Sequence, residues 1–467
     1  MYVYTYCLYV LSNHKIMNAS FKLIIAIVSL GGLLFGFDMA VVSGIIPLVK
    51  SDFGLSPLQE GLFVSSALIG CILGVAFAGK LSDKYGRKLL LIAAAALFFL
   101  SAIGCSLSPG FELLLVARWL SGVGVGVASI VVPLYIAEVA PSKIRGRAVT
   151  FYQLAVTIGI LVAYLSNALV LHYEWHWFDG TYWRMMFLIG ALPALLFWIG
   201  LYRIPESPRW LMQQGNDTKA SAIMRELEIH EIVVTPSSTK GAKVSLFTPV
   251  YRQALLLGLL LPLFSQLSGI NAIVYFGPTI LLQSGLSLSG SLQTQIWFGL
   301  ANVIFTCIAI WKVDSWGRRP LYLVGSAGAT ISLLLTSWFI NYNIQLYGWL
   351  LVLTILGFLL CFAFSIGPLK FVVASEIFPS AIRGQAMAVS VLVMWIADAL
   401  VGQLTPLMLS SWGSAWTFRF FAVCCAIAFF AVFYLLPETK GKSLEEIEAY
   451  WLNKFKKKQK NENTNLK

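Results

Sequence analysis

The chain has 467 residues, of which 58% are hydrophobic and only 12% are charged. A soluble globular domain carries about 25% charged residues, so the composition excludes a soluble protein and indicates one that crosses a membrane many times. The net charge of +12 would suggest a nucleic-acid partner in a soluble protein, but in a membrane protein it marks cytoplasmic loops. We therefore expect a lipid bilayer as partner and no nucleic acid.

The N-terminal segment lacks the features of a secretory signal. Residues 1–11 have neither a basic start nor a small-residue cleavage site. Because Met17 stands directly before the first apolar run, residues 1–16 are a candidate for a mis-called start.

Hydropathy predicts twelve membrane spans, so the expected fold class is an all-α membrane protein. The spans are expected near residues 21–49, 60–80, 89–108, 111–137, 148–171, 184–204, 254–283, 293–312, 320–340, 347–374, 385–410 and 416–436. The seventh span is expected to break at Gly269 and Pro278. The expected domains are a cytoplasmic N-terminus (1–20), an N-terminal six-helix bundle (21–204), a partly helical cytoplasmic linker (205–251), a C-terminal six-helix bundle (252–436) and a basic cytoplasmic tail (437–467).

Basic residues predict the orientation in the membrane. All but five of the 33 lysines and arginines lie in the N-terminus, the C-terminal tail or the loops after even-numbered spans. The exceptions are Lys50, Arg184 and Arg419 in the other loops, and Arg118 and Lys370 inside spans. Because cytoplasmic loops are rich in Lys and Arg, we expect both termini in the cytoplasm. The compact loops favour a bacterial inner (cell) membrane.

The first span contains one acidic residue, Asp38, within its apolar run. An ionised side chain at this depth costs about 2.5–3.5 kcal/mol or more, so a partner or a function is expected. Arg118 lies at a similar depth in the fourth span, counting ~1.5 Å per residue. A neighbouring arginine favours the ionised carboxylate, and its removal favours protonation. We interpret the two residues as a proton-coupling pair; a static ion pair is the alternative.

Three short motifs occur once in each half of the chain, in the same order. The pairs are Asp83–Lys88 with Asp314–Arg319, Glu138–Gly146 with Glu376–Gly384, and Pro205–Ser207 with Pro437–Thr439. Their acidic residues are separated by 231, 238 and 232 positions. A repeat at near-constant spacing predicts two homologous bundles with a substrate site between them.

These motifs make the chain resemble the sugar porter family of the major facilitator superfamily, from about Phe21 to Trp451. The resemblance rests on Gly31–Asp38, the two Asp-x-x-Gly-Arg loops, Pro205–Leu211, Gln266 with Gly269–Asn271, and Pro437–Gly441. Bacterial proton–pentose symporters of the xylose type are the members it resembles in particular. The resemblance implies two pseudo-symmetric six-helix bundles and proton-coupled import of a sugar or polyol by alternating access.

The resemblance also implies which side chains bind the substrate. Amides supply both donors and acceptors for sugar hydroxyls without a charge. Gln153, Gln266, Asn271 and Asn302 are the expected amides, and Tyr275 is the expected outer gate. For each amide, a hydrogen bond between helices is the alternative interpretation.

The C-terminal half departs from the family pattern near this site. Ser265 stands where a second glutamine is frequent, and Phe371 stands where many members have a tryptophan. Trp395 is an expected ring contact, but Asp398 and Lys370 place two charges in the eleventh and tenth spans.

Intramembrane charges indicate a functional site. Lys370 and Asp398 either pair with each other, with Lys370 snorkelling as a variant of this reading, or contact the substrate. In the second case the substrate is a polyol or carries a carboxylate.

The duplicated charged residues are expected to form an inner gate that holds the outward-facing state through ion pairs between the bundles. The residues are Asp83, Arg87, Glu138, Arg145, Asp314, Arg318, Glu376 and Arg383. A solvated charged surface is the alternative.

The sequence predicts no enzyme, cofactor or metal site, since no nucleophile–base constellation, nucleotide loop or cysteine cluster is present. Besides a proton symporter, a proton-independent uniporter, an importer of another small solute and a transporter-like nutrient sensor stay open.

Overall fold

The computed structural model of the protein describes residues 19–141, 145–176, 181–227, 248–341, 344–379, 382–440 and 446–454. The candidate mis-called start, residues 1–16, lies outside these ranges.

Twelve segments of the described chain are helical, and long and apolar enough to cross a membrane. This confirms the predicted number of spans and the all-α fold class. The first six spans are α2 (Ala19–Phe53), α3 (Pro57–Tyr85), α4 (Arg87–Ser106), α5 (Phe111–Val139), α6 (Arg145–His172), and α7 (Tyr182–Ile189) joined to α8 (Ala191–Tyr202). Two short helices follow, α9 (Pro208–Gln213) and α10 (Asp217–Glu226).

The last six spans follow the same plan with more interruptions. They are η1 (Pro249–Tyr251) with α11 (Arg252–Leu267) and α12 (Ile270–Gln283), α13 (Leu288–Trp316), α14 (Arg318–Phe339), α15 (Ile344–Cys361) with η2 (Phe362–Ile366) and α16 (Gly367–Ile377), α17 (Arg383–Ser411), and α18 (Gly413–Leu435).

Several helices extend beyond the apolar run because polar residues complete their ends. α3 begins at Pro57, before the predicted start of the span. The Ser56 hydroxyl accepts a hydrogen bond from the Gln59 backbone nitrogen (3.4 Å), and the Gln59 side chain accepts one from the Ser56 nitrogen (2.9 Å). This capping box satisfies N–H groups that a helix start leaves free. Hydropathy registers apolar residues and therefore misses such a start.

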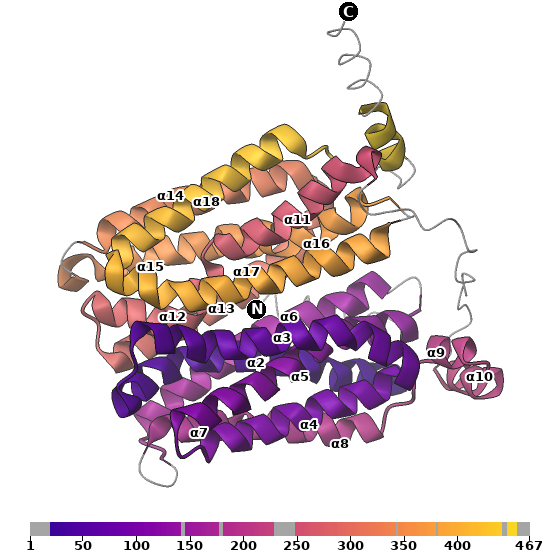
Figure 1. Ribbon diagram of the computed structural model, residues 1–467, viewed down its shortest axis with the longest axis horizontal. Helices are drawn as coiled ribbons and strands as arrows, with labels where there is room; N and C mark the ends of the chain where they lie inside the picture. The colour runs from indigo at the N-terminus through magenta and orange to yellow at the C-terminus, as the bar shows by residue number, and fades with distance from the viewer. Residues whose placement is uncertain are drawn as a thin grey trace, which may run out of the picture.

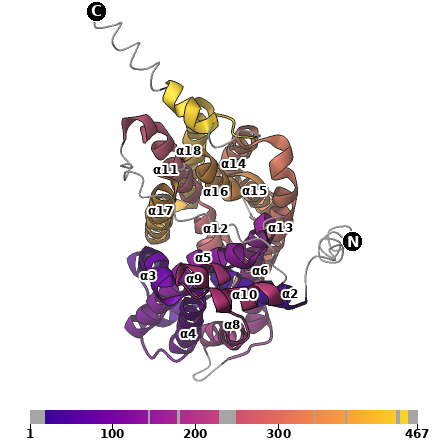
Figure 2. The ribbon, with the colours of Figure 1, turned by 90° about the vertical axis from the view of Figure 1, so that its right-hand side faces the viewer.

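The spans form two bundles that lie side by side (Figure 1). α2 to α8 make up the N-terminal bundle, and α11 to α18 make up the C-terminal bundle. Helices α9 and α10 lie at one end of the N-terminal bundle, which we call the linker end; Figure 2 looks onto it. Across the two bundles, α17 packs against α3, α13 against α6, and α12 against α2.

Glycine allows α2 and α6 to touch backbone to backbone. A Cβ atom on Gly36 of α2 would overlap the carbonyl group of Val156 in α6, and a Cβ on Gly159 of α6 would overlap that of Leu33 in α2. Small residues at helix crossings permit this close packing in membranes. The crossing fixes the position of Asp38, which lies two residues beyond Gly36.

The seventh span breaks at only one of the two expected places. Gly269 has a φ of +85° between α11 and α12, a left-handed conformation that favours glycine. The predicted break at Pro278 is wrong, because α12 continues through this residue to Gln283. A proline removes one backbone hydrogen bond, which a membrane helix packed among neighbours tolerates.

We predict that Gly36→Ala lowers the stability of the folded protein by about 1–3 kcal/mol or more, because the added methyl group forces α2 away from α6. The melting temperature of the purified protein in detergent measures the effect. Gly79→Ala in α3 is the matched control, since no atom lies within 4 Å of its added Cβ. Equal melting temperatures for the two variants would contradict the proposed role of this crossing.

Candidate functional site

Asp38 of α2 and Arg118 of α5 form an ion pair inside the N-terminal bundle. Asp38 Oδ1 lies 2.9 Å from Arg118 Nη1, and the Ser121 hydroxyl donates to Oδ2 at 3.2 Å. The guanidinium also lies over the rings of Phe63 and Phe187, at 6.0 and 5.9 Å. The side chain of Asp38 is 14% exposed and that of Arg118 is 2% exposed. The carboxylate is therefore the accessible partner, and the guanidinium is held between rings.

The ion pair is neutral as a whole, and of its two members only the carboxylate can change its charge. Arginine stays protonated in proteins, whereas a carboxylate can accept a proton when its surroundings change. The sequence placed the two residues at similar depth, and the structure brings them into contact. Ser121, one turn from Arg118 on α5, is a partner that sequence reasoning missed.

A second buried carboxylate, Asp398 of α17, lies in the C-terminal bundle and is 3% exposed. The Asn271 amide donates to its Oδ1 at 2.6 Å, and the Tyr275 hydroxyl lies 3.4 and 3.3 Å from its two oxygens. Asn271 and Tyr275 are one turn apart on α12, so Asp398 fastens α12 to α17. The Tyr275 hydroxyl also lies 3.6 Å from the Met39 sulfur in α2, next to Asp38.

Lys370 of α16 contacts Ser265 rather than Asp398. Its Nζ donates to the Ser265 hydroxyl of α11 at 3.2 Å and lies 5.3 Å from the centre of the Phe371 ring. No ion pair within 4.0 Å joins Lys370 to Asp398 or to any other carboxylate of the described residues. Direct pairing, one of the two readings of these charges, is not observed in this conformation.

Three of the four expected amides keep their hydrogen-bonding groups free. Among the described residues, no hydrogen bond engages the side chain of Gln153 in α6, Gln266 in α11 or Asn302 in α13. Asn271, the fourth, is engaged by Asp398. The Trp395 ring of α17 lies 5.7 Å from the ring of Phe35 in α2, so an aromatic contact crosses between the bundles.

Hydrogen bonds join the two bundles towards the end away from the linker. The Ser65 hydroxyl of α3 donates to the Gln403 side chain of α17 at 2.7 Å, and the Gln403 amide donates to the Leu58 carbonyl at 3.1 Å. The Ser43 hydroxyl of α2 donates to the Gln295 side chain of α13 at 3.0 Å. These contacts hold α2 and α3 against the C-terminal bundle at this end.

Comparison with known proteins places the chain in a family. The family profile "Sugar (and other) transporter" matches residues 24–451. The arabinose-proton symporter of Bacillus subtilis (strain 168) is 39% identical over 435 residues, covering 91% of this chain and 93% of the symporter. The chain belongs to the sugar porter family of the major facilitator superfamily.

Two further relatives support this assignment. The probable metabolite transport protein CsbC of Bacillus subtilis (strain 168) is 37% identical over 447 residues, covering 93% of this chain and 95% of CsbC. The xylose transporter XylE from E. coli, solved in a partially occluded inward-open conformation, matches with a TM-score of 0.79 and 32% identity, covering 91% of this chain and 100% of XylE. The match confirms the two-bundle major facilitator fold and a multi-pass transporter rather than an enzyme.

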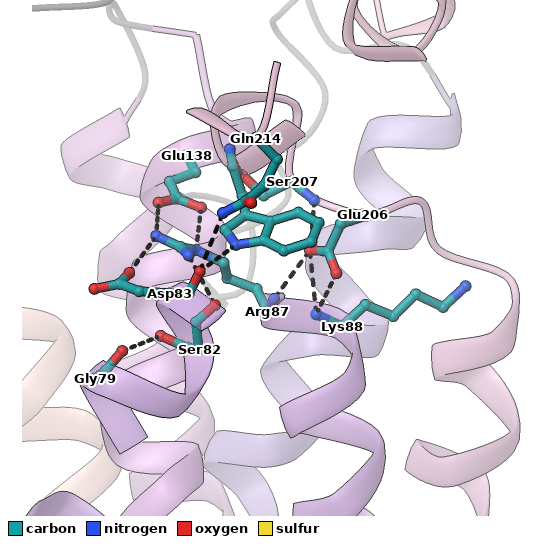
Figure 3. Close-up of polar contacts among 10 residues, drawn as sticks. Gly79, Ser82, Asp83, Arg87, Lys88, Glu138, Glu206, Ser207 and Gln214 are labelled. Atoms are coloured by element: carbon teal, nitrogen blue, oxygen red, sulfur yellow. Dashed lines mark hydrogen bonds and ion pairs between the residues drawn. The ribbon is translucent and has the colours of Figure 1, made fainter. Parts of the chain in front are cut away.

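At the linker end of the transporter, the duplicated motifs form a compact joint in each bundle. In the N-terminal bundle, Arg87 at the start of α4 binds Glu138 of α5 through two 2.9 Å hydrogen bonds, and Asp83 lies 3.2 Å from the same guanidinium (Figure 3). Glu206 accepts hydrogen bonds of 3.1–3.2 Å from the backbone nitrogens of Arg87 and Lys88. A carboxylate at this position satisfies the free N–H groups of α4 and the positive end of its dipole.

The C-terminal bundle repeats this joint. Arg318 at the start of α14 binds Glu376 of α16, with Nη2 and Nε at 3.0 and 3.2 Å from the same oxygen. Glu438 accepts hydrogen bonds of 3.1 Å from the backbone nitrogens of Arg318 and Arg319, and one of 2.8 Å from Lys440. The sequence shows that these motifs are duplicated. It does not reveal that Glu206 caps the start of α4 and Glu438 caps the start of α14.

A signal for this cap was present in the sequence. Gly86 and Gly317 precede the capped helices, with φ values of +96° and +88°. A Cβ on Gly86 would overlap the Glu206 carboxylate. The Gly of Asp-x-x-Gly-Arg and the Glu of the Pro-Glu motif therefore belong to one joint, which explains why both recur together.

The ion pairs of the two joints, Arg87 with Asp83 and Glu138, and Arg318 with Glu376, each lie within one bundle. They are not the ion pairs between bundles that the sequence predicts. The Arg383 side chain likewise donates to the Phe378 carbonyl of its own bundle, at 3.2 and 3.1 Å. The side chains of Arg145 and Asp314 lie outside the described residues. A lock between the bundles stays a prediction for a conformation that is closed at the linker end.

The two capping glutamates differ in pKa. Burial raises the pKa of Glu206 above its usual value, against the opposing effect of backbone N–H groups. Burial also acts to raise the pKa of Glu438, which is less buried, but four backbone N–H groups together outweigh it and the pKa is lowered. Equivalent positions of the two bundles therefore respond differently to acid.

We predict that Glu438→Gln destabilises the protein at pH 7 and that this loss shrinks towards pH 4. A carboxyl group whose pKa is lower in the folded than in the unfolded chain, about 4.3, stabilises the fold above that value and loses the effect as the pH falls. The melting temperatures of wild type and variant across this range measure the difference.

Glu206→Gln is the matched control, because its raised pKa reverses the sign. The stability of the wild type relative to this variant should increase as the pH falls through the same range. If the stability of the wild type relative to each variant changes in the same direction with pH, the predicted difference between Glu206 and Glu438 is contradicted.

Proposed function

We propose that the transporter imports a sugar or polyol together with a proton by alternating access. The observation that supports this most is the ion pair between Asp38 and Arg118, 2.9 Å apart inside the first and fourth spans. An intramembrane carboxylate marks a proton or ion pathway by default, and this one has a partner that stabilises its charged form.

In this mechanism Asp38 alternates between two states. While it is ionised, Arg118 and Ser121 hold it by the contacts described above. Protonation removes the attraction to Arg118, and the freed guanidinium shifts the balance between the two conformations. A proton and a substrate that favour the same conformation are thermodynamically coupled.

The energy of one proton is sufficient for useful accumulation. Moving one charge across about 100 mV supplies about 2.3 kcal/mol. At about 1.4 kcal/mol per factor of ten, this supports a concentration ratio of roughly forty.

The substrate class is inferred from the free amides and from the relatives. Gln153, Gln266 and Asn302 have unused donors and acceptors, as hydroxyl groups require, and Trp395 and Phe371 supply ring faces. The relatives include symporters named for arabinose and xylose, and a glucose transporter. A sugar or polyol fits both observations.

The same proposal assigns a membrane orientation and a conformation. Lys and Arg concentrate in the loops at the linker end, so we infer that this end and both termini face the cytoplasm of a bacterial inner membrane. The contacts of Ser65 and Ser43 with the C-terminal bundle then close the outer side. We infer an inward-facing conformation, in keeping with the partially occluded inward-open XylE that the chain matches.

We predict that Asp38→Asn abolishes accumulation of substrate but preserves exchange down a gradient. The amide keeps the size of the side chain but cannot carry the proton. Uptake of labelled sugars into proteoliposomes, with and without an imposed pH gradient and a protonophore, measures both activities.

Asp217→Asn in the exposed helix α10 is the control for replacing an aspartate. If Asp38→Asn still accumulates sugar against its gradient, the proton role of Asp38 is wrong and a uniporter or another coupling site replaces it.

A further inference from the structure

Lys370 is a basic residue in the interior of a span, and no carboxylate of the described residues lies in contact with its ammonium. Arg118 and Arg87, by contrast, each contact a carboxylate at 2.9 Å. The only hydrogen bond of Lys370 among the described residues is the one to Ser265, a neutral hydroxyl. The Phe371 ring, whose centre lies 5.3 Å from Nζ, is its other contact. A half-buried ammonium with only neutral contacts favours an anionic partner.

The Asp398 carboxylate, in the interior of the C-terminal bundle, already has hydrogen-bond donors. Asp398 accepts hydrogen bonds from Asn271 and Tyr275 of α12. Turning Asp398 towards Lys370 would break the fastening of α12 to α17. In this conformation the ammonium therefore stays available to a group that does not belong to the protein.

The position of the ammonium links it to the proposed sugar site. Ser265, which it contacts, is the direct neighbour of Gln266 at the end of α11. Ser265 is also fully buried, so its contact with Lys370 lies inside the bundle. The ammonium therefore contacts the same turn of α11 that carries Gln266, an amide that is free to bind a hydroxyl group.

The chemistry of the ammonium selects the ligand. It has three N–H donors, of which Ser265 takes one, so two remain for an acceptor. A carboxylate is the acceptor that both binds these donors and neutralises the charge. A single ammonium neutralises one negative charge, and the Asp398 carboxylate in the same bundle disfavours a second.

We propose that Lys370 binds the carboxylate of a sugar acid, so that the substrate is a monoanionic uronate or aldonate rather than a neutral sugar. This rests on the proposed function, since the hydroxyl groups of the same molecule occupy the free amides. Lys370 is then a specificity-determining residue.

The first test uses the unmodified full-length protein in proteoliposomes with an imposed pH gradient. Uptake of labelled D-glucuronate is challenged with unlabelled glucuronate and with glucuronamide, which has the same shape without the charge. Glucuronate should compete roughly 10- to 100-fold better, the range expected for a hydrogen bond to a charged group. Equal competition, or uptake of neutral D-glucose and D-xylose in preference to glucuronate, would overturn the inference.

The second test assigns the effect to the residue. Lys370→Met should lose the preference for glucuronate over glucuronamide, Lys370→Arg should retain most of it, and Lys22→Met, on the exposed surface of α2, should leave it unchanged. A preference that survives in Lys370→Met would contradict the assignment.

The outcomes separate the two proposals. Proton-driven accumulation of neutral sugars without that of sugar acids overturns the inference about Lys370 and supports the proposed function. If neither neutral sugars nor sugar acids accumulate, both fail.

Discussion

A charged side chain inside a membrane protein needs an opposite charge or several hydrogen bonds, because water does not solvate it there. Arg118 is the partner of Asp38, and the rings of Phe63 and Phe187 cover it. Asp398 meets the same requirement through two donors on α12. The second arrangement joins Asp398 of α17 to α12, which begins at the break of its span at Gly269. The need to compensate an interior charge therefore joins α2 to α5 and α12 to α17.

The sequence was sufficient to predict the spans, because a run of about 20 apolar residues in a chain with few charges has one interpretation. It also placed Asp38 and Arg118 at one depth. It could not predict that Ser121 completes their contact, or that Gln403 crosses to Ser65, because such contacts depend on helix rotation and on how the bundles meet. The predicted break at Pro278 is wrong for a related reason, because the helices packed around a proline decide whether it breaks a membrane helix.

The duplicated joints at the linker end show how one motif can serve two bundles and still diverge. Glu206 and Glu438 cap equivalent helices through the same backbone groups. Their surroundings differ, since burial dominates at Glu206 and hydrogen bonding dominates at Glu438. The repeated motif therefore indicates a shared geometry. The pKa of each glutamate depends on how deeply it is packed, which the motif does not encode.

The neutral ion pair of Asp38 and Arg118 also bears on how membrane voltage acts. Because the two charges cancel in the empty transporter, an electric field exerts little force on this pair during the return step. Under the proposed mechanism that step also requires the contacts of Ser43 and Ser65 across the bundles to break. In the proposed proton symport, voltage acts on the loaded form instead, through the summed charge of proton and cargo. A neutral cargo makes uptake electrogenic, whereas a monoanion leaves it electrically silent and driven by the proton concentration alone.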